Sequence, residues 1–280
     1  MRQALGEAWL PLFSGALIVV ATYGLFQTAA DRQLAVIATV CQAEAGRVQL
    51  ELAHELDSRA GVMERLAAAK ADAGDDWRAE ADAVLEGEAQ FRAIMAFDSS
   101  LAPGEARPPA ARELSILDPH DDGTRVPALR VATELPGREA VVVSTAPLAA
   151  GERQVLVCAP VMRGRLRTGW LVGVTRLPEL VDAALARTTQ AGFDAGVFEG
   201  PTLLHGVRTD DGGPGVRFAR DAVVVRGPLL WRVAVWPDEE LTRRLQSWDP
   251  IGLFITGMLL AFFVALSIHL WREQAAGSRS

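Results

Sequence analysis

The fold is decided by residues 154–189, which read QVLVCAPVMRGRLRTGWLVGVTRLPELVDAALARTT. Two apolar runs rich in valine flank the turn signal RGR, which is typical of two strands joined by a hairpin. Pro178 then opens a helix-like segment, and proline is favoured in the first turn of a helix. The stretch therefore predicts strands at 154–161 and 167–177 and a helix that begins at residue 178.

Shorter strands are expected on both sides of this hairpin. Residues 91–98 (FRAIMAFD) and 141–148 (VVVSTAPL) are strand-like. The segment 99–123 between them is rich in proline, glycine and acidic residues, which predicts a long loop. After the helix, a second set of strands is predicted at 194–200, 202–207, 216–219, 222–227 and 229–237.

Two blocks without charged residues lie near the ends of the chain. Twenty-three residues separate Glu7 from Asp31, and 22 separate Asp249 from Arg272. A helix rises about 1.5 Å per residue and must cross about 30 Å of hydrocarbon, so both blocks are long enough to span a bilayer. We predict transmembrane helices at 9–30 and 249–271. A cleaved signal peptide is the alternative for the first block, but its apolar stretch is longer than such peptides usually have.

Two spans place both termini on one side of the membrane. Arg2, Arg272 and Arg279 flank the spans and favour a cytoplasmic location for residues 1–8 and 272–280. About 218 residues, from 31 to 248, are then expected on the periplasmic or extracellular side. Only Lys70 of the 28 basic residues is a lysine, which indicates a GC-rich bacterial genome and hence a bacterial inner membrane. The short tail has no room for a folded output domain such as a kinase.

A long helix is expected directly after the first span. Residues 31–70 contain no proline, and their apolar positions recur with a period of roughly 3.67 residues, which is helical. The pattern fits two arrangements equally: a stalk that pairs with a second copy, or a helix packed on the β-rich body of its own chain. A second, short helix is predicted at 75–88. The apolar stripe is formed by Leu34, Ile37, Cys41, Ala45, Val48, Leu52, Leu56, Ala60, Met63 and Ala67.

Composition excludes several classes of protein. Hydrophobic residues make up 50% and charged residues 22% of the 280 residues, so the chain is not disordered as a whole. The formal net charge of −7 disfavours a nucleic-acid partner, because an acidic chain repels phosphate backbones. Two cysteines, Cys41 and Cys158, are too few for a disulfide framework and do not have the spacing of zinc ligands.

The exported region resembles the CHASE domain, an extracytoplasmic sensor of receptor kinases and nucleotide cyclases. The resemblance is carried by the long helix that leads into residues 77–98 (WRAEADAVLEGEAQFRAIMAFD), and by 126–148 (VPALRVATELPGREAVVVSTAPL), 155–185 and 229–241 (LLWRVAVWPDEEL). It implies an α+β fold: a stalk and short helix at 31–90, a membrane-distal PAS-like sheet at 91–190 and a membrane-proximal β subdomain at 191–248. In this family the distal sheet often binds a small ligand.

Catalytic chemistry is not expected. Glu51 and His54 form a single Glu-x-x-His, whereas a di-metal carboxylate site needs two copies from different helices. Residues 118–123 (DPHDDG) begin like a calcium loop, but position twelve is Leu129 where a glutamate is needed. Cys158 lies in an apolar strand, where a small buried side chain is the ordinary interpretation. We therefore predict a protein that is not an enzyme and has no cofactor and no metal.

A ligand pocket is predicted in the first sheet. Met95, Phe97 and Trp170 would line a cavity, and polar side chains near the strand ends would orient the ligand. The alternative is that the three apolar side chains are plain core, since apolar strand residues are usually buried. The polar set consists of Asp98, Ser144, Thr145 and Arg163.

The spans offer contact positions for other membrane helices. Gly15 and Gly24 are small enough to let a neighbouring helix approach closely, and His269 lies near the cytoplasmic end of the second span. Two functions follow. The first is a sensor module that binds a small molecule and acts through a partner protein or a second copy of itself. The second is a non-catalytic structural subunit of a larger membrane complex, such as a respiratory or photosynthetic assembly.

Overall fold

The computed structural model describes residues 2–73, 77–87, 91–108, 134, 139–144, 153–188, 191–207, 215–245 and 249–277. The chain divides into two compact units. We call residues 1–40 with 239–280 the helix unit, and residues 41–238 the sheet unit. Helix α1 (Arg2–Ala73) begins in the helix unit and ends in the sheet unit.

The helix unit pairs the N-terminal part of α1 with α6 (Asp249–Gly277), which the short α5 (Glu239–Leu245) precedes. Small residues mark the contact between the two long helices. A Cβ at Gly257 would overlap the buried side chain of Thr22, and a Cβ at Gly15 would lie 3.7 Å from that of Ala265. Close packing through small residues is the usual way in which helices associate in a bilayer.

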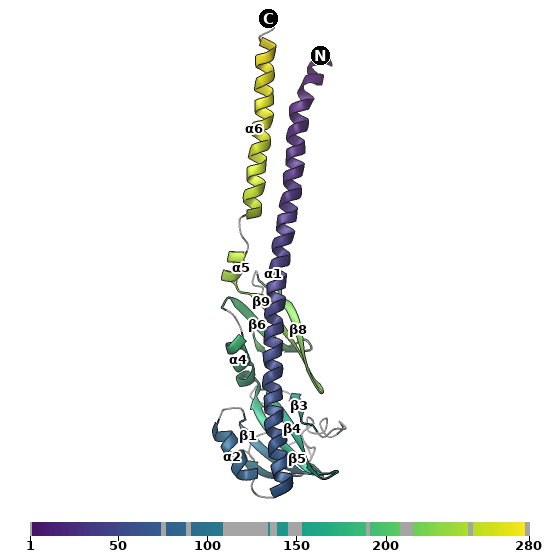
Figure 1. Ribbon diagram of the computed structural model, residues 1–280, viewed down its shortest axis with the longest axis vertical. Coiled ribbons are helices and arrows are strands. Elements are labelled where there is room, and N and C mark those ends of the chain that lie inside the picture. The colour runs from purple at the N-terminus through teal and green to yellow at the C-terminus, as the bar shows by residue number, and fades with distance from the viewer. Residues whose placement is uncertain are drawn as a thin grey trace. The chain divides into compact units, whose positions relative to one another are not determined.

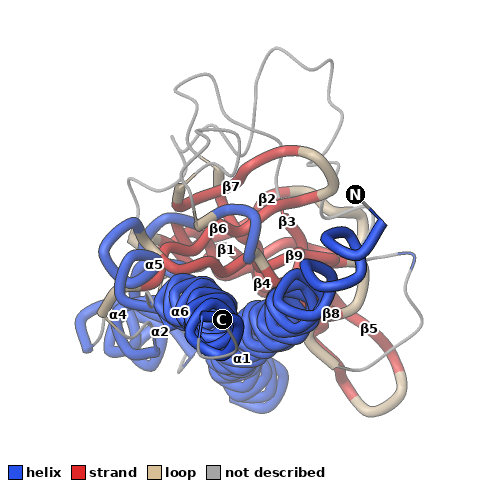
Figure 2. The backbone as a smooth tube through the Cα atoms, turned by 90° about the horizontal axis from the view of Figure 1, so that it is seen from above, coloured by secondary structure: helices blue, strands red, loops and turns tan. Residues whose placement is uncertain are grey.

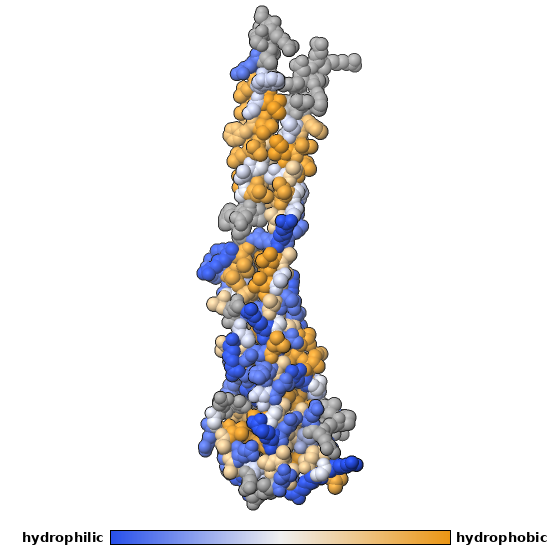
Figure 3. All heavy atoms as spheres, viewed as in Figure 1, coloured by the Kyte–Doolittle hydropathy of each residue, from blue (hydrophilic) through white to orange (hydrophobic). Residues whose placement is uncertain are grey.

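The surface of this helix pair is apolar. Phe13, Leu17 and Val20 on α1, and Phe262 and Phe263 on α6, are all more than half exposed. Figure 3 shows such side chains, in orange, over the visible face of both helices. By length and composition both helices are able to cross a membrane, and the apolar part of α1 ends where charges return at Asp31. An exposed apolar surface of this extent is typical of a membrane protein.

The sheet unit contains two antiparallel sheets (Figure 1). The first sheet has the strand order β2-β1-β5-β4-β3, and β4 and β5 form the predicted hairpin. The hairpin closes around Gly164, whose φ of +62° is a left-handed conformation that favours glycine. The strands are β1 (Ala93–Asp98), β2 (Pro103–Arg107), β3 (Val141–Ser144), β4 (Gln154–Arg163) and β5 (Leu166–Arg176).

Helix α4 (Leu177–Thr188) follows β5 and leads into the second sheet. It begins at Leu177, one residue before Pro178, where the sequence predicts its start. The second sheet has the order β7-β6-β9-β8. Its strands are β6 (Phe193–Glu199), β7 (Thr202–Gly206), β8 (Arg220–Arg226) and β9 (Leu229–Pro237).

Within the sheet unit, α1 packs along one face of both sheets (Figure 2). Its stripe residues Ala45, Val48, Leu52, Leu56 and Met63 are fully buried in a core shared with strands of both sheets and with α4. The helical period therefore matches packing on the chain's own body, which was one of the two arrangements that the sequence allowed. Its polar side chains also reach the edge of the second sheet, since Gln49 Nε2 donates a 2.9 Å hydrogen bond to the main-chain oxygen of Val223 on β8.

Two local predictions were wrong. Residues 216–219 form a 3₁₀ turn (η3, Val216–Phe218) and not a strand, because a four-residue alternation cannot distinguish a strand from a turn with one buried side chain, here Phe218. The predicted loop 99–123 contains strand β2. Its side chains are held by α2 (Trp77–Gly87): Arg78 pairs with Glu105, and Asp82 lies 3.5 Å from Arg107.

Both cysteines are expected to react slowly with thiol reagents in the folded full chain. Cys41 and Cys158 are completely buried. Burial raises the pKa of the Cys41 thiol in spite of the nearby Arg220 charge, and raises that of Cys158 to about 12. Because the thiolate is the reactive form, modification at pH 8 should become fast only in denaturant. A Leu50→Cys variant, exposed on the same helix, provides the fast control. Rapid disulfide-linked dimer formation through Cys41 in native protein would instead indicate that α1 is a dimer seam.

Candidate functional site

The predicted apolar residues meet on one face of the first sheet. Met95 and Phe97 alternate along β1, and Phe97 pairs in register with Trp170 on β5. All three side chains are buried in one cluster, on the opposite face from α1. Arg167 lies over the Trp170 ring, with 4.8 Å between the guanidinium carbon and the ring centroid. The cluster also contains Ala93, Ala106, Val143, Leu156, Cys158, Val172 and Val174.

Of the four predicted polar residues, the two whose side chains the structure describes, Asp98 and Arg163, do not belong to this cluster. The Asp98 carboxylate holds the turn between β1 and β2: its Oδ1 accepts hydrogen bonds from the main-chain nitrogens of Ser100 (2.8 Å) and Ala102 (2.9 Å). Arg163 lies at the end of β4, on the side of the sheet where α1 ends. The Ser144 side chain and Thr145 lie outside the described residues.

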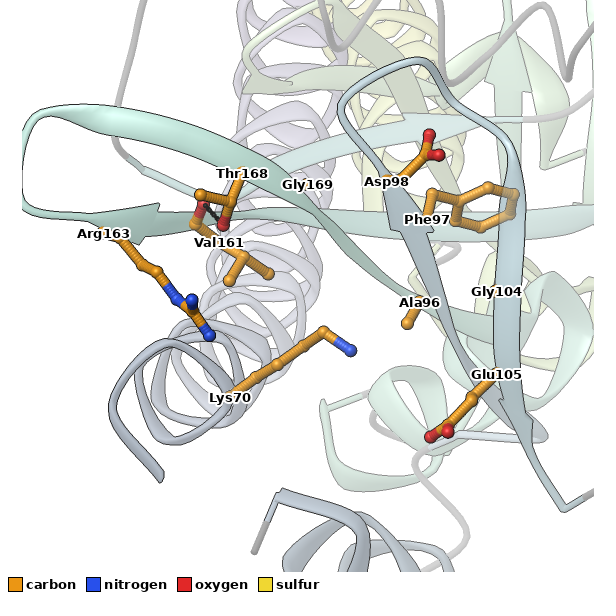
Figure 4. Close-up of a pocket in the computed structure, with 10 residues that line it drawn as sticks. All are labelled: Lys70, Ala96, Phe97, Asp98, Gly104, Glu105, Val161, Arg163, Thr168 and Gly169. Atoms are coloured by element: carbon orange, nitrogen blue, oxygen red, sulfur yellow. Dashed lines mark hydrogen bonds between the residues drawn. The ribbon is translucent and has the colours of Figure 1, made fainter. Parts of the chain in front are cut away.

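A cavity of about 430 Å³ lies where the end of α1 meets two hairpins of the first sheet (Figure 4). Lys70 extends from the last turn of α1 toward Ala96 and Glu105, whereas Arg163 lines the cavity from the end of β4, on the opposite side of Lys70. The Phe97 ring and the Asp98 carboxylate point away from Lys70, although both residues belong to the wall. The remaining wall is formed by Ala96, Gly104, Glu105, Val161, Thr168 and Gly169.

Charged groups around the cavity are held in place by their neighbours. The Lys70 ammonium lies 4.2 Å from the centroid of the Trp77 ring. Arg78 donates to both carboxylate oxygens of Glu105, from Nε at 2.7 Å and from Nη2 at 2.5 Å. This hydrogen bonding outweighs the effect of burial and, with the charges of Arg78, Lys70 and Arg107, lowers the pKa of Glu105. Glu105 is therefore an ionised, fixed group at neutral pH.

Sequence reasoning missed Lys70, Glu105 and Thr168. The cavity forms where the end of a long helix meets strands that are distant in the sequence, and a local pattern does not show such a meeting. One signal pointed to Lys70, because it is the only lysine among 28 basic residues. Thr168 Oγ1 donates a 3.1 Å hydrogen bond to the main-chain oxygen of Val161, which links the two strands of the hairpin.

A second, more open depression of about 610 Å³ lies between α1 and the end of α4. It contains Glu51 and His54, together with Arg47, Leu50, Arg187 and Thr188. Glu51 forms an ion pair with Arg187, with 3.1 Å between Oε1 and Nη1. Within the described residues no three His, Cys, Asp or Glu side chains come together as a metal site would require, and residues 118–123 lie outside them.

The three membrane-contact positions differ in their surroundings. Gly15 faces Ala265 on α6 of the same chain. Gly24 has no atom within 4 Å of the place where a Cβ would lie, so its side of α1 is open to a further helix or to lipid. His269 is exposed on α6.

Comparison with known proteins gives a match in structure only. No protein-family model matches the sequence. No curated protein is similar to it at a significant level. Solved structures do match. The ligand-binding domain of the Pseudomonas fluorescens chemoreceptor CtaA, in complex with L-isoleucine, gives a TM-score of 0.54 at 14% identity, covering 78% of this chain and 98% of that one.

A second receptor gives the same result. The ligand-binding domain of the Pseudomonas aeruginosa PAO1 amino acid chemoreceptor PctB, in complex with L-Arg, gives a TM-score of 0.51 at 15% identity, covering 71% of this chain and 94% of that one. The fold is that of a chemoreceptor ligand-binding domain. Both neighbours are ligand-binding domains of chemoreceptors, and the likeness to them is one of fold.

Proposed function

We propose that this chain is a membrane-anchored sensor module that binds a small molecule in its first sheet and acts through a partner protein. The fold, shared with ligand-binding domains of chemoreceptors, is the observation that carries the proposal. The CtaA and PctB structures hold amino acids, so amino acids and similar small metabolites are the first compounds to test. Two of the four ligand-orienting residues proposed from the sequence, Asp98 and Arg163, belong to the wall of the cavity beside Lys70.

The proposal extends to topology. The two apolar helices support a chain that is anchored twice, with the sheet unit outside the cytoplasm and both termini inside. Lys70 and the first apolar segment belong to one continuous helix, α1. A ligand held by Lys70 would therefore act on the helix that enters the membrane. This arrangement suits a CHASE-like receptor component that passes its signal to another protein.

Ligand binding should raise the melting temperature of the full chain in detergent. A ligand at about 100 times its Kd stabilises the folded state by about 2.7 kcal/mol, which corresponds to a shift of roughly 5–10 °C for a unit of this size. The measurement is a thermal scan against the standard amino acids and small organic acids. A complete absence of shifts would contradict the sensor proposal.

One observation favours the second function, a structural subunit. The open side of α1 at Gly24 suits close approach of a helix from another protein. If the chain co-purifies in fixed stoichiometry with another membrane protein, and Gly24→Leu but not Gly61→Leu releases it, the structural role is favoured. Gly61 is an equally open glycine of α1, in the sheet unit.

A further inference from the structure

The end of the β4–β5 hairpin is a basic, exposed surface of the sheet unit. We call residues 163–167 (RGRLR) the hairpin tip. The tip has three arginines in five residues, and all five residues are exposed. No acidic residue occurs in the sequence between Glu152 and Glu179, although the chain as a whole has a net charge of −7. Positive charge is therefore concentrated at this point of an acidic protein.

Charge at the base of the hairpin is balanced, whereas charge at the tip is not. Arg153, just before β4, pairs with Glu199 on β6 at 2.8 Å. Within the residues that the structure describes, no acidic side chain forms an ion pair with any arginine of the tip. Arg167 instead lies over the ring of the buried Trp170. The tip therefore presents unpaired positive charge on the surface of the sheet unit.

An apolar side chain projects from the same tip. Leu166 is 74% exposed, more than any other large hydrophobic residue that the structure describes, including those on the apolar surfaces of α1 and α6. Leu166 pairs in register with Arg163 across the hairpin, so the two side chains lie next to each other on one face of the ribbon. A single exposed leucine is ordinary. A leucine between unpaired guanidinium groups gives the tip a mixed apolar and basic surface.

The tip projects beyond the strands that flank the hairpin, and its shape is fixed (Figure 4). Among the described strands, β1 pairs with β5 only as far as Gly169, and β3 pairs with β4 no further than Cys158. Gly164 takes its φ of +62° in the turn, and the Thr168 hydroxyl donates a hydrogen bond to the main-chain oxygen of Val161 on the other strand. A surface that is already ordered loses little conformational entropy when it binds.

We propose that the hairpin tip docks an acidic segment of a partner protein. The inference rests on the part of the proposed function in which the chain acts through a partner, and it names the chemistry of that partner. Carboxylates of the segment would pair with Arg163 and Arg165, because a guanidinium binds a carboxylate through two parallel hydrogen bonds. An apolar residue of the segment would cover Leu166. Opposite charges orient two proteins and speed their association, which suits a signalling contact.

A short acidic segment fits this surface better than an extended anionic surface such as lipid headgroups. Asp98 begins the turn of the neighbouring β1–β2 hairpin, and the chain as a whole is acidic. Charges at a protein surface act over about 8 Å at physiological salt. A short segment would meet mainly the arginines of the tip, whereas an extended surface would also meet repelling carboxylates. One leucine also buries too little apolar area to hold a protein in a bilayer.

A photoreactive residue at the tip tests the proposal in living cells. p-Benzoylphenylalanine in place of Leu166 keeps an apolar side chain there, and irradiation of cells that carry the full chain should link it to one protein. Mass spectrometry should place the link within or beside a run of Asp and Glu residues. The same probe at Leu50, which is exposed on α1 to a similar degree, should not give this product. Links to lipid, links to segments without acidic residues, or no link at all would overturn the proposal.

Charge variants measure what the arginines contribute. The linked segment, made as a synthetic peptide, would be titrated by calorimetry into the full chain in detergent. Arg163→Gln combined with Arg165→Gln should weaken binding roughly tenfold or more, because two charge-assisted contacts are lost. Arg92→Gln, an exposed arginine at the opposite end of β1, should leave binding unchanged. These side chains are exposed, so the variants should fold as the unaltered chain does. Equal binding by the double variant would overturn the assignment of the surface.

The outcomes separate this inference from the proposed function. If a small molecule stabilises the full chain but the tip gives no link to an acidic segment, the sensor proposal stands and the docking surface is wrong. If the tip binds an acidic segment and no small molecule shifts the melting temperature, the docking surface stands and the sensor proposal is wrong.

Discussion

Replacing Glu55 by leucine is expected to lower the free energy of unfolding by about 3–5 kcal/mol. Glu55 and Arg59 lie one turn apart on α1, and both are buried. Arg59 Nη1 donates to the Glu55 carboxylate and also, at 3.0 Å, to its main-chain oxygen. Without the carboxylate, the Arg59 guanidinium stays buried and loses the charge and hydrogen bond of Glu55, which is the costly way to break such a pair.

A double variant separates the cost of leaving Arg59 buried without Glu55 from the stability that the ion pair itself contributes. Glu55→Leu combined with Arg59→Met should recover most of the lost stability, because well-packed apolar residues often replace a buried ion pair at little cost. Glu51→Gln is the matched control: its carboxylate binds the exposed guanidinium of Arg187, so the loss should stay below about 1 kcal/mol. Denaturant unfolding of the full chain provides the measurement. Equal losses for Glu55→Leu and Glu51→Gln would show that burial of the pair is unimportant.

The same pair predicts a dependence on pH. Burial opposes ionisation of Glu55, but the hydrogen bonds and charges of Arg59 and Arg187 outweigh it and lower the pKa below the ordinary 4.5. A carboxyl with a lowered pKa in the folded state contributes stability that is present above the unfolded pKa and is lost as the pH falls through the folded one. Stability of the unaltered chain should therefore fall more steeply below pH 4.5 than stability of the double variant does.

Local sequence patterns predicted the elements whose signals are long. The stripe from Cys41 to Ala67 has one period over many turns, and all its residues except the partly buried Ala60 are buried. The β4–β5 hairpin was visible because two apolar runs surround a glycine turn. β2 was not visible, since it contains one buried apolar residue, Ala106, and its place depends on pairing with β1 and on ion pairs with α2.

The candidate site, too, could be predicted from the sequence only where the signal is local. Alternation along β1 placed Met95 and Phe97 on one face, and pairing with β5 brings Trp170 to them. The choice between the two faces of the sheet is not local, so Arg163 was grouped with an apolar cluster although it belongs to the cavity on the other side. Lys70 lines the cavity only because α1, a helix of 72 residues, ends next to the first sheet, and a local pattern does not show where such a helix ends in space.

Gly169→Ala is expected to lower the free energy of unfolding by more than about 3 kcal/mol, the upper end of ordinary overpacking. Gly169 lies opposite Asp98 where β5 pairs with β1, and it lines the cavity beside Lys70. A Cβ at this position would overlap the main-chain oxygen of Phe97. No rotamer change can relieve a clash with backbone, so the two strands must separate and lose hydrogen bonds.

Two further glycine-to-alanine variants grade the effect by what the new Cβ meets. At Gly173 it would lie 2.5 Å from the Phe91 ring and 2.8 Å from Met63 Sδ, side chains that can shift, so a loss of about 1–3 kcal/mol is expected. At Gly61, inside α1, it would meet nothing within 4 Å, and alanine should stabilise the helix by about 0.5–1 kcal/mol. Denaturant unfolding should therefore give the following order of stability, from highest to lowest: Gly61→Ala, the unaltered chain, Gly173→Ala and Gly169→Ala. A Gly169→Ala protein as stable as Gly173→Ala would mean that β1 and β5 can separate at that point at little cost, and that the cavity wall they form is not rigid.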